Sequence, residues 1–400
     1  MPMSRVAATS RPPHLSGSAP EKGGLPDFSS WFASTSAPGP AAHARTAEGS
    51  GVSYHDLRDE AAGHGAPGAP GAAGSPAACA GLALAQVVDI FDEGSVHAAL
   101  DRAQSLNSPA LVRLYEKMLA TGGSRFVTKP ADHAGLDVVD ALCPNFSQVT
   151  QELRRAVELS NFGTSSLRFL PILLAGDPGV GKTHFAKQLA RALGVGYHFV
   201  SMGTLSASWV LSGSAPTWNG ARHGKVAQAL IDGEFANPLF LLDEIDKTNG
   251  AAQYDPFGAL LQLLERETAA HFVDEFIDLP LDVSCALWVA TANDLGQIPD
   301  YILSRMTVFE VPPPTQDQAR VIALNVYRFL LAENGWRFAP AVCDDVLAML
   351  AQVPPREMKK RLVTALGNAR LARRDHILAC DIEPERAGRS AGMGFTASLR

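Results

Sequence analysis

The chain has 400 residues, of which 46% are hydrophobic and 19% are charged, and its formal net charge is −7. This length and hydrophobic content are enough for one large folded core or two smaller ones, as in an ordinary enzyme. The net negative charge argues against a protein that mainly coats nucleic acid, because such proteins present a basic surface that releases counterions. It does not exclude a local basic patch.

The cysteines and the apolar runs indicate the compartment. The five cysteines are Cys79, Cys143, Cys285, Cys343 and Cys380. Their odd number and the lack of a C-x-x-C pair indicate neither a disulfide framework nor a zinc site, so we expect reduced thiols. No apolar run reaches the roughly 18 residues that span a membrane, and the first residues lack the apolar core of a secretory signal. We therefore expect a cytoplasmic protein with no membrane partner.

Two segments precede the expected catalytic core. Residues 1–80 are rich in Ala, Gly, Pro and Ser, as in GHGAPGAPGAAGSPAA, and cannot bury enough apolar surface to offset the entropy of ordering. We predict a disordered arm there, which is either a tether for a partner or an inert extension. Residues 81–135 are predicted to form a small helical segment, because three stretches place apolar residues three and four positions apart. These stretches are LALAQVVDIF, SVHAALDRAQ and ALVRLYEKMLA.

Residues 136–312 alternate helical segments with short apolar runs. The runs are FLPILLAG, GYHFVSM, NPLFLLDE and CALWVATAN. Runs of this kind are typical of strands buried on both faces of a parallel sheet, so we predict an α/β core. After PPPT the periodicity becomes purely helical, which predicts an all-helical domain over residues 313–380. Residues 381–400 are expected to form a flexible tail.

A phosphate-binding loop is predicted between the first apolar run of the core and the helix that follows. The sequence GDPGVGKT has the G-x-x-x-x-G-K-[ST] pattern, and its strand–loop–helix context gives that pattern mechanical meaning. Its glycines let backbone N–H groups point at a phosphate, the lysine neutralises phosphate oxygens, and the threonine is a Mg²⁺ ligand. The expected nucleotide-binding residues are Gly176, Asp177, Pro178, Gly179, Val180, Gly181, Lys182, Thr183 and His184, the last being the start of the helix. We therefore expect ATP and Mg²⁺ as ligands.

Acidic residues end the next apolar strand, in PLFLLDEIDK. Asp243 is suited to hold Mg²⁺ through its water shell, and Glu244 to deprotonate the attacking water. The alternative is that both residues only cap the next helix. Asn293, at the end of WVATAN, can position the same water. Arg305 is suited to reach the γ-phosphate of a neighbouring subunit. Its alternative is a surface arginine in a salt bridge at the end of a helix.

The order of these motifs resembles the AAA+ ATPases, and among them the ATPase module of the Lon proteases. The segments that carry the resemblance are GDPGVGKT and NPLFLLDEIDK (the Walker A and Walker B motifs), TWNGARHGKVAQAL, DPFGALLQLLE, WVATAN, ILSRM and PPREMKKRL, between about Val138 and Ile377. The resemblance implies a P-loop NTPase core of five strands with a helical lid, assembled as a homo-oligomeric ring that is usually hexameric. It also implies that Asn293 is sensor 1, Arg305 the arginine finger and Arg356 sensor 2.

A pore loop is implied at Trp218, Asn219 and Gly220. An exposed aromatic side chain on a glycine-bounded loop can press on any polypeptide without reading its sequence. Asn219 departs from the family, which favours an apolar residue there. The alternative is a tryptophan packed on its own subunit.

The resemblance favours an ATP-driven ring that remodels or unfolds a protein client. Only Ile382 to Arg400 follow the lid, too short a stretch for the Ser–Lys protease domain of the Lon proteases, so we expect an ATPase without its own peptidase. The basic run REMKKRLVTALGNARLARR supports an alternative, a nucleotide-gated ATPase that acts on DNA in replication or defence. A second alternative is a switch in which ATP only assembles a scaffold.

Overall fold

The computed structural model describes residues 82–204, 208–218, 220–248 and 257–382. The predicted arm over residues 1–80 and nearly all of the predicted tail lie outside these residues. The chain divides into two units, one made of residues 66–330 and 337–400 and the other of residues 1–65 and 331–336. Every site discussed below belongs to the first unit.

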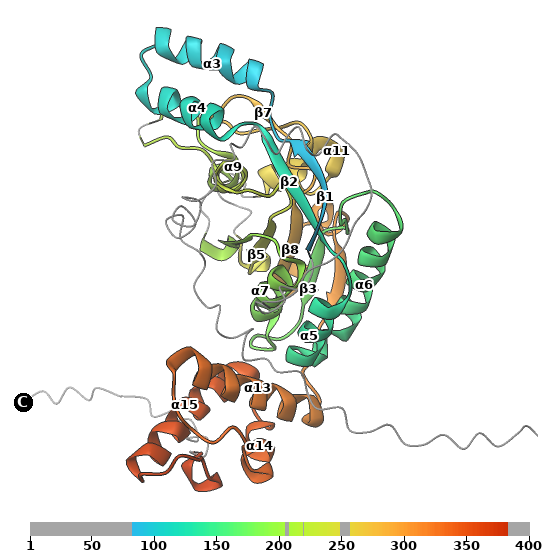
Figure 1. Ribbon diagram of the computed structural model, residues 1–400, viewed down its shortest axis with the longest axis vertical. Helices are drawn as coiled ribbons and strands as arrows, with labels where there is room; N and C mark the ends of the chain where they lie inside the picture. The colour runs from blue at the N-terminus through green and yellow to red at the C-terminus, as the bar shows by residue number, and fades with distance from the viewer. Residues whose placement is uncertain (1–81, 205–207, 219, 249–256, 383–400) are drawn as a thin grey trace, which may run out of the picture. The chain divides into compact units, whose positions relative to one another are not determined.

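A five-stranded parallel sheet forms the centre of the fold and has the strand order β4-β5-β8-β3-β9 (Figure 1). Its strands are β3 (Ile172–Ala175), β4 (Tyr197–Ser201), β5 (Leu239–Asp243), β8 (Leu287–Ala292) and β9 (Thr307–Glu310). Every residue of β3 and β8 is buried, as expected for strands covered on both faces. The α/β fold and its four sequence-predicted strands are confirmed. The fifth strand, β9, was not recognised from its residues. It is a short edge strand whose residues alternate between partly buried and exposed.

The register of the sheet brings the ends of three strands together. Ala175 at the end of β3 lies opposite Ala292 at the end of β8, and Leu242 in β5 lies opposite Ala290 in β8. In a parallel sheet the residues that follow these strands leave from the same edge. Loops after β3, β5 and β8 can therefore share one site, which is where ligands bind in open α/β sheets.

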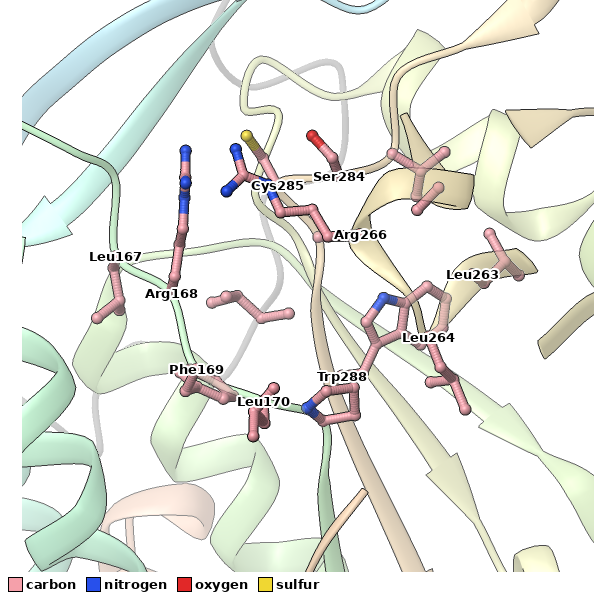
Figure 2. A pocket seen from close by; sticks show the side chains of 15 residues that line it. Leu167, Arg168, Phe169, Leu170, Leu263, Leu264, Arg266, Ser284, Cys285 and Trp288 are labelled. Atoms are coloured by element: carbon pink, nitrogen blue, oxygen red, sulfur yellow. The ribbon is translucent and has the colours of Figure 1, made fainter. Parts of the chain in front are cut away.

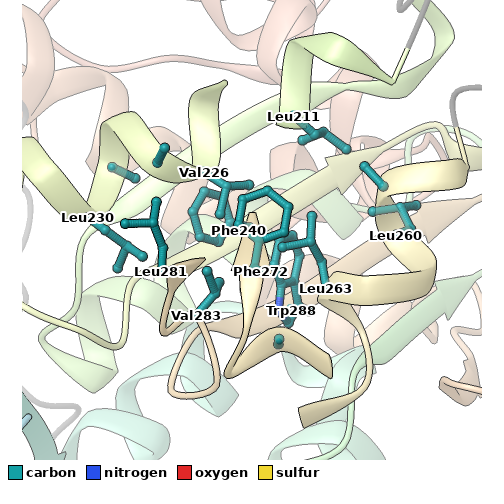
Figure 3. Packing of buried hydrophobic residues seen from close by; sticks show 14 of the residues in the cluster. Leu211, Val226, Leu230, Phe240, Leu260, Leu263, Phe272, Leu281, Val283 and Trp288 are labelled. Carbon is teal, nitrogen blue, oxygen red and sulfur yellow. The ribbon is translucent and has the colours of Figure 1, made fainter. Parts of the chain in front are cut away.

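Helices and shorter elements surround the sheet. The longer ones are α5 (Ala134–Leu142), α6 (Ser147–Phe162), α7 (Lys182–Leu193) and α9 (Lys225–Asp232). The shorter ones are α8 (Trp209–Ser212), α10 (Gly258–Leu263), α11 (Arg266–Ala269), α12 (Asp300–Leu303) and the two-stranded sheet of β6 (Phe272–Val273) and β7 (Pro280–Leu281). Figure 3 shows the core on one side of the sheet, where Phe240 of β5 stacks on Trp288 of β8 with 4.7 Å between ring centroids. Aliphatic side chains of α9 and α10 pack around this pair, including Val226, Leu230 and Leu260.

The segment before the sheet is not wholly helical, so the prediction of a small helical segment over residues 81–135 is wrong for its first part. Its first part is a strand, β1 (Leu82–Asp89), which pairs antiparallel with β2 (Ser124–Pro130). The helices α3 (Glu93–Ser105) and α4 (Pro109–Thr121) lie between the two strands, where the sequence predicts them. The stretch LALAQVVD was misread because its apolar residues fit helical spacing, whereas its conformation is set by β2, which follows more than 30 residues later.

Strand β2 also joins this segment to the α/β core. The backbone N–H of Phe126 donates to the carbonyl of Glu234 (3.1 Å), and the N–H of Ala236 donates to the carbonyl of Phe126 (2.8 Å). The buried amide of Asn237 accepts from the N–H of Thr128 (3.2 Å) and donates to its carbonyl (2.7 Å). Since Asn237 lies two residues before β5, these bonds fix the start of that strand.

The C-terminal part of the described chain is helical, as predicted. It contains α13 (Gln316–Asn334), α14 (Asp344–Leu350) and α15 (Pro355–Leu371). The Tyr327 side chain is buried among these helices, and its hydroxyl donates to the carbonyl of Ala339 (2.7 Å). Pro355 begins α15, a position where its missing N–H costs no helical hydrogen bond.

Candidate nucleotide-binding site

The loop between β3 and α7 has the backbone of a phosphate cradle. Gly176 has φ 152°, and a Cβ atom there would lie 2.5 Å from the carbonyl oxygen of Val311. Gly181 has φ 107°, a conformation that side chains rarely allow. Helix α7 begins directly after it, at Lys182 rather than at the predicted His184. The free N–H groups and positive end of this 12-residue helix favour an anion at the loop.

Lys182 lies across this loop. Its buried ammonium group donates to the carbonyls of Gly176 (2.5 Å) and Asp177 (3.1 Å) and to Oδ1 of Asn293 (2.9 Å). Burial lowers the pKa of the Lys182 amine, while the nearby carboxylates of Asp246 and Asp243 act to raise it. The structure therefore brings together the predicted phosphate-binding lysine and the predicted sensor asparagine, from the ends of β3 and β8.

Thr183 and Asp243, the two predicted magnesium ligands, lie next to each other. The Thr183 hydroxyl donates to Oδ1 of Asp243 at 2.9 Å. Hydroxyl and carboxylate oxygens, with water and phosphate in the remaining positions, are what Mg²⁺ prefers. The residues present therefore fit a magnesium ion held next to the phosphate cradle.

Glu244 has an unusual backbone. Its φ of 55° and ψ of 50° lie in the left-handed region, which costs about 1–2 kcal/mol for a residue with a side chain. Its side chain is exposed, at the carboxyl end of β5. An exposed carboxylate at this edge of the sheet can contact a water molecule beside the phosphate cradle.

Two buried polar residues of this network were missed by the sequence analysis. The Thr291 hydroxyl donates to Oδ1 of Asp243 (2.7 Å) and accepts from the N–H of Glu244 (2.9 Å). The fully buried Asp246 side chain accepts from the N–H groups of Asn293 (3.1 Å) and Asp294 (3.2 Å) through Oδ2. One available signal was that Thr291 is polar within an apolar strand, where a buried hydroxyl needs a partner.

Arg305 lies near the amino ends of β3 and β9, whereas the phosphate loop leaves the carboxyl end of β3. It precedes β9 by two residues, and the first residue of β9 pairs with the first residue of β3, Ile172. Arg305 Nε lies 2.7 Å from Oε1 of Glu265, and its Nη1 donates to the carbonyl of Tyr301 (2.5 Å). The chain thus displays the ion pair named above as the alternative for Arg305, and it does not bring this residue to Lys182.

Arg356 lies near the phosphate loop through the start of α15. A Cβ atom built on Gly179 would be 3.6 Å from Cβ of Arg356 and 3.7 Å from Cβ of Pro354. The Arg356 side chain is exposed. Its position is compatible with a contact to a bound nucleotide.

Trp218 lies in a loop with a well-defined base. Its side chain is 48% exposed, Gly220 has φ 81°, and Asn219 lies outside the described residues. At the base, the N–H of Ser214 donates to the carbonyl of Arg222 (3.1 Å), and the N–H of Arg222 donates to Oγ of Ser214 (3.2 Å). The bonds close the loop below the exposed tryptophan.

Asp274 anchors this base from a neighbouring turn. Its fully buried carboxylate accepts from the N–H groups of Gly224 (2.7 Å), Phe276 (2.9 Å) and Ile277 (3.2 Å). Burial raises the pKa of Asp274, and the three N–H bonds act against this rise. Gly224 is required here because a Cβ atom would lie 2.0 Å from the carbonyl oxygen of Leu211.

Replacing Asp274 by Asn should therefore destabilise the fold. The amide keeps one acceptor oxygen and turns an NH₂ group toward backbone N–H donors, which we expect to cost about 2–3 kcal/mol. The measurement is the free energy of unfolding from urea titration. Asp294→Asn is the matched control, because Asp294 is a cap that accepts from the N–H of Gly296 (2.9 Å), a role asparagine fills equally well. Equal stability of the two variants would contradict the anchoring role.

A separate pocket of about 370 Å³ lies at the amino ends of β3 and β8 (Figure 2). Its walls are mostly apolar and include Leu170, Leu264 and Trp288, with the guanidinium groups of Arg168 and Arg266 nearby. The phosphate loop leaves β3 at the opposite end. This pocket is therefore distinct from the candidate nucleotide site.

The basic run, which lies on α15 and on the residues just after it, is partly neutralised by its neighbours. Lys360 pairs with Glu357 (3.0 Å), and Arg374 makes two bonds to the carboxylate of Asp381 (2.7 and 2.6 Å). Lys359 lies 5.5 Å above the ring of Phe329.

In the described part of the chain, no helix is both long enough and apolar enough to cross a bilayer.

One family model and several known proteins match parts of this chain. Residues 172–313 match the family described as "ATPase family associated with various cellular activities (AAA)". Lon protease 1 of Thermus thermophilus is 36% identical over 189 residues, which are 47% of this chain and 24% of that protein. The Lon protease of Halothermothrix orenii is 41% identical over 167 residues, 41% of this chain and 21% of that protein.

A third relative and one solved structure extend these comparisons. The mitochondrial Lon protease homolog of Schizosaccharomyces pombe is 45% identical over 138 residues, 34% of this chain and 13% of that protein. The match therefore spans at most about a quarter of each of these three relatives. The Thermotoga maritima RuvB Holliday junction branch migration motor has a TM-score of 0.41 and 19% identity, covering 59% of this chain and 66% of that one.

Proposed function

We propose, from the match of residues 172–313 to the AAA family of ATPases, that the chain hydrolyses ATP in a ring of identical subunits and remodels a protein client. The relatives with the reported identities are Lon proteases, but the matched part is a minor share of each. The assignment of each residue below therefore rests on the geometry of this chain.

The phosphate loop would hold ATP. Backbone N–H groups from Gly176 to Thr183 would surround the phosphates, and Lys182 would exchange its carbonyl partners for phosphate oxygens. Thr183 and Asp243 would hold Mg²⁺, which when bound neutralises phosphate charge. Val180, within this loop, is buried.

Glu244 is the proposed general base. Its exposed carboxylate would take a proton from the water that attacks the γ-phosphate, while the Asn293 amide orients that water. Both residues follow strands whose carboxyl ends are adjacent in the sheet, β5 and β8. Asn293 already contacts Lys182, so the base, the sensor and the phosphate loop form one connected set.

The position of Arg305 supports an assembly in which it acts on a neighbour. Arg305 lies at the amino ends of the strands and the phosphate loop at their carboxyl ends, so this arginine cannot complete the nucleotide site of its own chain. A head-to-tail ring would place this side of one subunit against the phosphate loop of the next. We propose a hexamer on the basis of the family resemblance.

The exposure of the Trp218 side chain is the observation that supports a polypeptide client. It is a large aromatic side chain, about half exposed, on a loop that is anchored at its base by Asp274. Such a residue can grip varied side chains by non-specific apolar contact. The partial neutralisation of the basic residues on α15 and just after it, at Lys360 and Arg374, makes the DNA-associated alternative the weaker one.

Replacing Trp218 by Ala should uncouple hydrolysis from client processing. We expect basal ATP turnover to stay within about 2-fold of the unchanged protein, because the loop base and the phosphate site keep their contacts. ATP-dependent unfolding of a fluorescent protein with an unstructured tail should fall about 10-fold or more, since one buried aromatic contact is lost at each step. Fluorescence loss and phosphate release are measured on the same samples.

Trp336→Ala is the matched control, because Trp336 is also partly exposed, at 38%, but lies in the helical C-terminal part. Full unfolding activity in Trp218→Ala would refute the pore-loop assignment. Hydrolysis stimulated by DNA rather than by polypeptide, and weakened steeply by salt, would instead favour the DNA-associated alternative.

A further inference from the structure

Thr291 connects the two acidic residues at the end of β5. It is the fifth residue of β8 and is 2% exposed. Its hydroxyl oxygen lies 2.7 Å from Oδ1 of Asp243 and 2.9 Å from the backbone nitrogen of Glu244. A single side-chain atom on β8 therefore contacts both the last residue of β5 and the residue that follows it.

The direction of both hydrogen bonds is fixed by the chemistry of the partners. An ionised carboxylate only accepts and a backbone N–H only donates, so the Thr291 hydroxyl must donate to Asp243 and accept from Glu244. The hydroxyl proton is thus committed to the carboxylate. No other arrangement of this hydroxyl satisfies both partners at these distances.

Each of the two hydrogen bonds of the Thr291 hydroxyl constrains a different group, the carboxylate of Asp243 or the backbone of Glu244. Oδ1 of Asp243 accepts from Thr291 and also from Thr183, so two donors fix the carboxylate plane and leave Oδ2 available. The bond to the Glu244 N–H restrains a residue whose backbone is left-handed, with φ 55°. That backbone conformation sets the direction in which the Glu244 side chain leaves the strand.

We propose that Thr291 is the positioning residue that aligns the magnesium-binding carboxylate of Asp243 with the catalytic carboxylate of Glu244. This proposal rests on the proposed ATP hydrolysis. The only proton of the Thr291 hydroxyl is committed to Asp243, so Thr291 acts through Asp243 and Glu244 and does not donate to ATP. Catalysis depends on such alignment because an error of about 1 Å in a reacting group can cost about 100-fold in rate.

Asp246 supports the same alignment from the other side. It follows Glu244 by two residues, and its buried carboxylate accepts from the N–H of Asn293, two residues after Thr291. The turns that follow β5 and β8 are therefore joined by hydrogen bonds in both directions. Thr291 and Asp246 together hold Glu244 and Asn293 at a fixed separation.

The test compares Thr291→Val with Thr291→Ser. Valine keeps the volume and the β-branch but removes the hydroxyl, whereas serine keeps the hydroxyl. For Thr291→Val we expect kcat to fall about 10- to 100-fold, with the dissociation constant for ATP measured without Mg²⁺ within about 3-fold of the unchanged protein. Thr291→Ser should recover kcat to within about 3-fold, because it restores both bonds.

The outcomes separate this proposal from the proposed function. If the unchanged protein hydrolyses ATP and Glu244→Gln does not, but Thr291→Val has full kcat, the positioning role is refuted and the ATPase assignment stands. Equal loss in the Val and Ser variants, or a parallel loss of ATP binding, would also refute it, since a purely structural defect has that signature. If the unchanged protein does not hydrolyse ATP, the proposed function fails and the positioning role fails with it.

Discussion

Replacing Glu244 by Gln is expected to abolish ATP turnover while ATP binding is retained. Glutamine has the same length, and the backbone N–H of residue 244 still donates to the Thr291 hydroxyl, but the glutamine amide cannot take a proton from water. Loss of a general base costs about 10²- to 10⁴-fold in rate. The contacts of Lys182 to Gly176 and Asn293 do not involve this side chain, so the affinity for ATP should change by less than about 3-fold.

The measurement pairs phosphate release with equilibrium binding of a fluorescent ATP analogue. Glu267→Gln is the matched control, because Glu267 lies exposed on α11 and the substitution changes the charge of the protein by the same amount. Retention of more than about a tenth of the turnover by Glu244→Gln would place the base elsewhere. Loss of nucleotide binding would show that Glu244 acts on the fold of the site instead.

The parts of the fold that could be predicted are those whose signal is local. The strands β3 and β8 are buried along their whole length, so their residues form continuous apolar runs that are visible in the sequence. The phosphate loop is equally local, because Gly176 and Gly181 are required by the backbone of the loop itself. Helix α7 follows at once, and only its first residue differed from the prediction.

The parts that could not be predicted depend on distant pairing. Residues Leu82–Asp89 have helical spacing, but the strand forms because Asp89 lies opposite Ser124 and Leu82 opposite Pro130. Strand β9 is short and its residues alternate between partly buried and exposed, so it does not form the continuous apolar run of a buried strand. In both cases the deciding contacts are made with another strand, which a single sequence does not reveal.

The same reason applies to the candidate site. Asp243, Glu244 and Asn293 stand out because polar residues follow apolar strands. Thr291 stands out only as a polar residue within an apolar strand, and its partners depend on the register that sets Leu242 opposite Ala290 and so brings the next residue of each strand together. The sequence thus predicts which side chains could do chemistry at this edge of the sheet, while the residues that align them become visible only with the register.

Removing the Arg305 side chain should eliminate ATP hydrolysis at the nucleotide site of the neighbouring subunit. We expect Arg305→Ala to lower kcat about 10³-fold, the scale of an arginine supplied in trans to a transferring phosphoryl group. ATP binding should be retained, because Lys182 and the phosphate loop lie at the carboxyl ends of the strands. In the single chain Arg305 pairs with Glu265, so an intrachain salt bridge is the competing explanation of its presence.

A mixing experiment separates the two explanations. Lys182→Ala subunits lack the phosphate-binding ammonium but keep Arg305, whereas Arg305→Ala subunits keep the phosphate loop and lack the arginine. If Arg305 acts in trans, a mixture of the two inactive proteins forms rings in which about a quarter of the interfaces are complete, and activity returns. Mixing Arg305→Ala with the double variant Lys182→Ala/Arg305→Ala supplies no arginine and should stay inactive. Activity in neither mixture, despite subunit exchange, would restrict Arg305 to its bond with Glu265, because that contact lies within one chain and cannot be supplied by another.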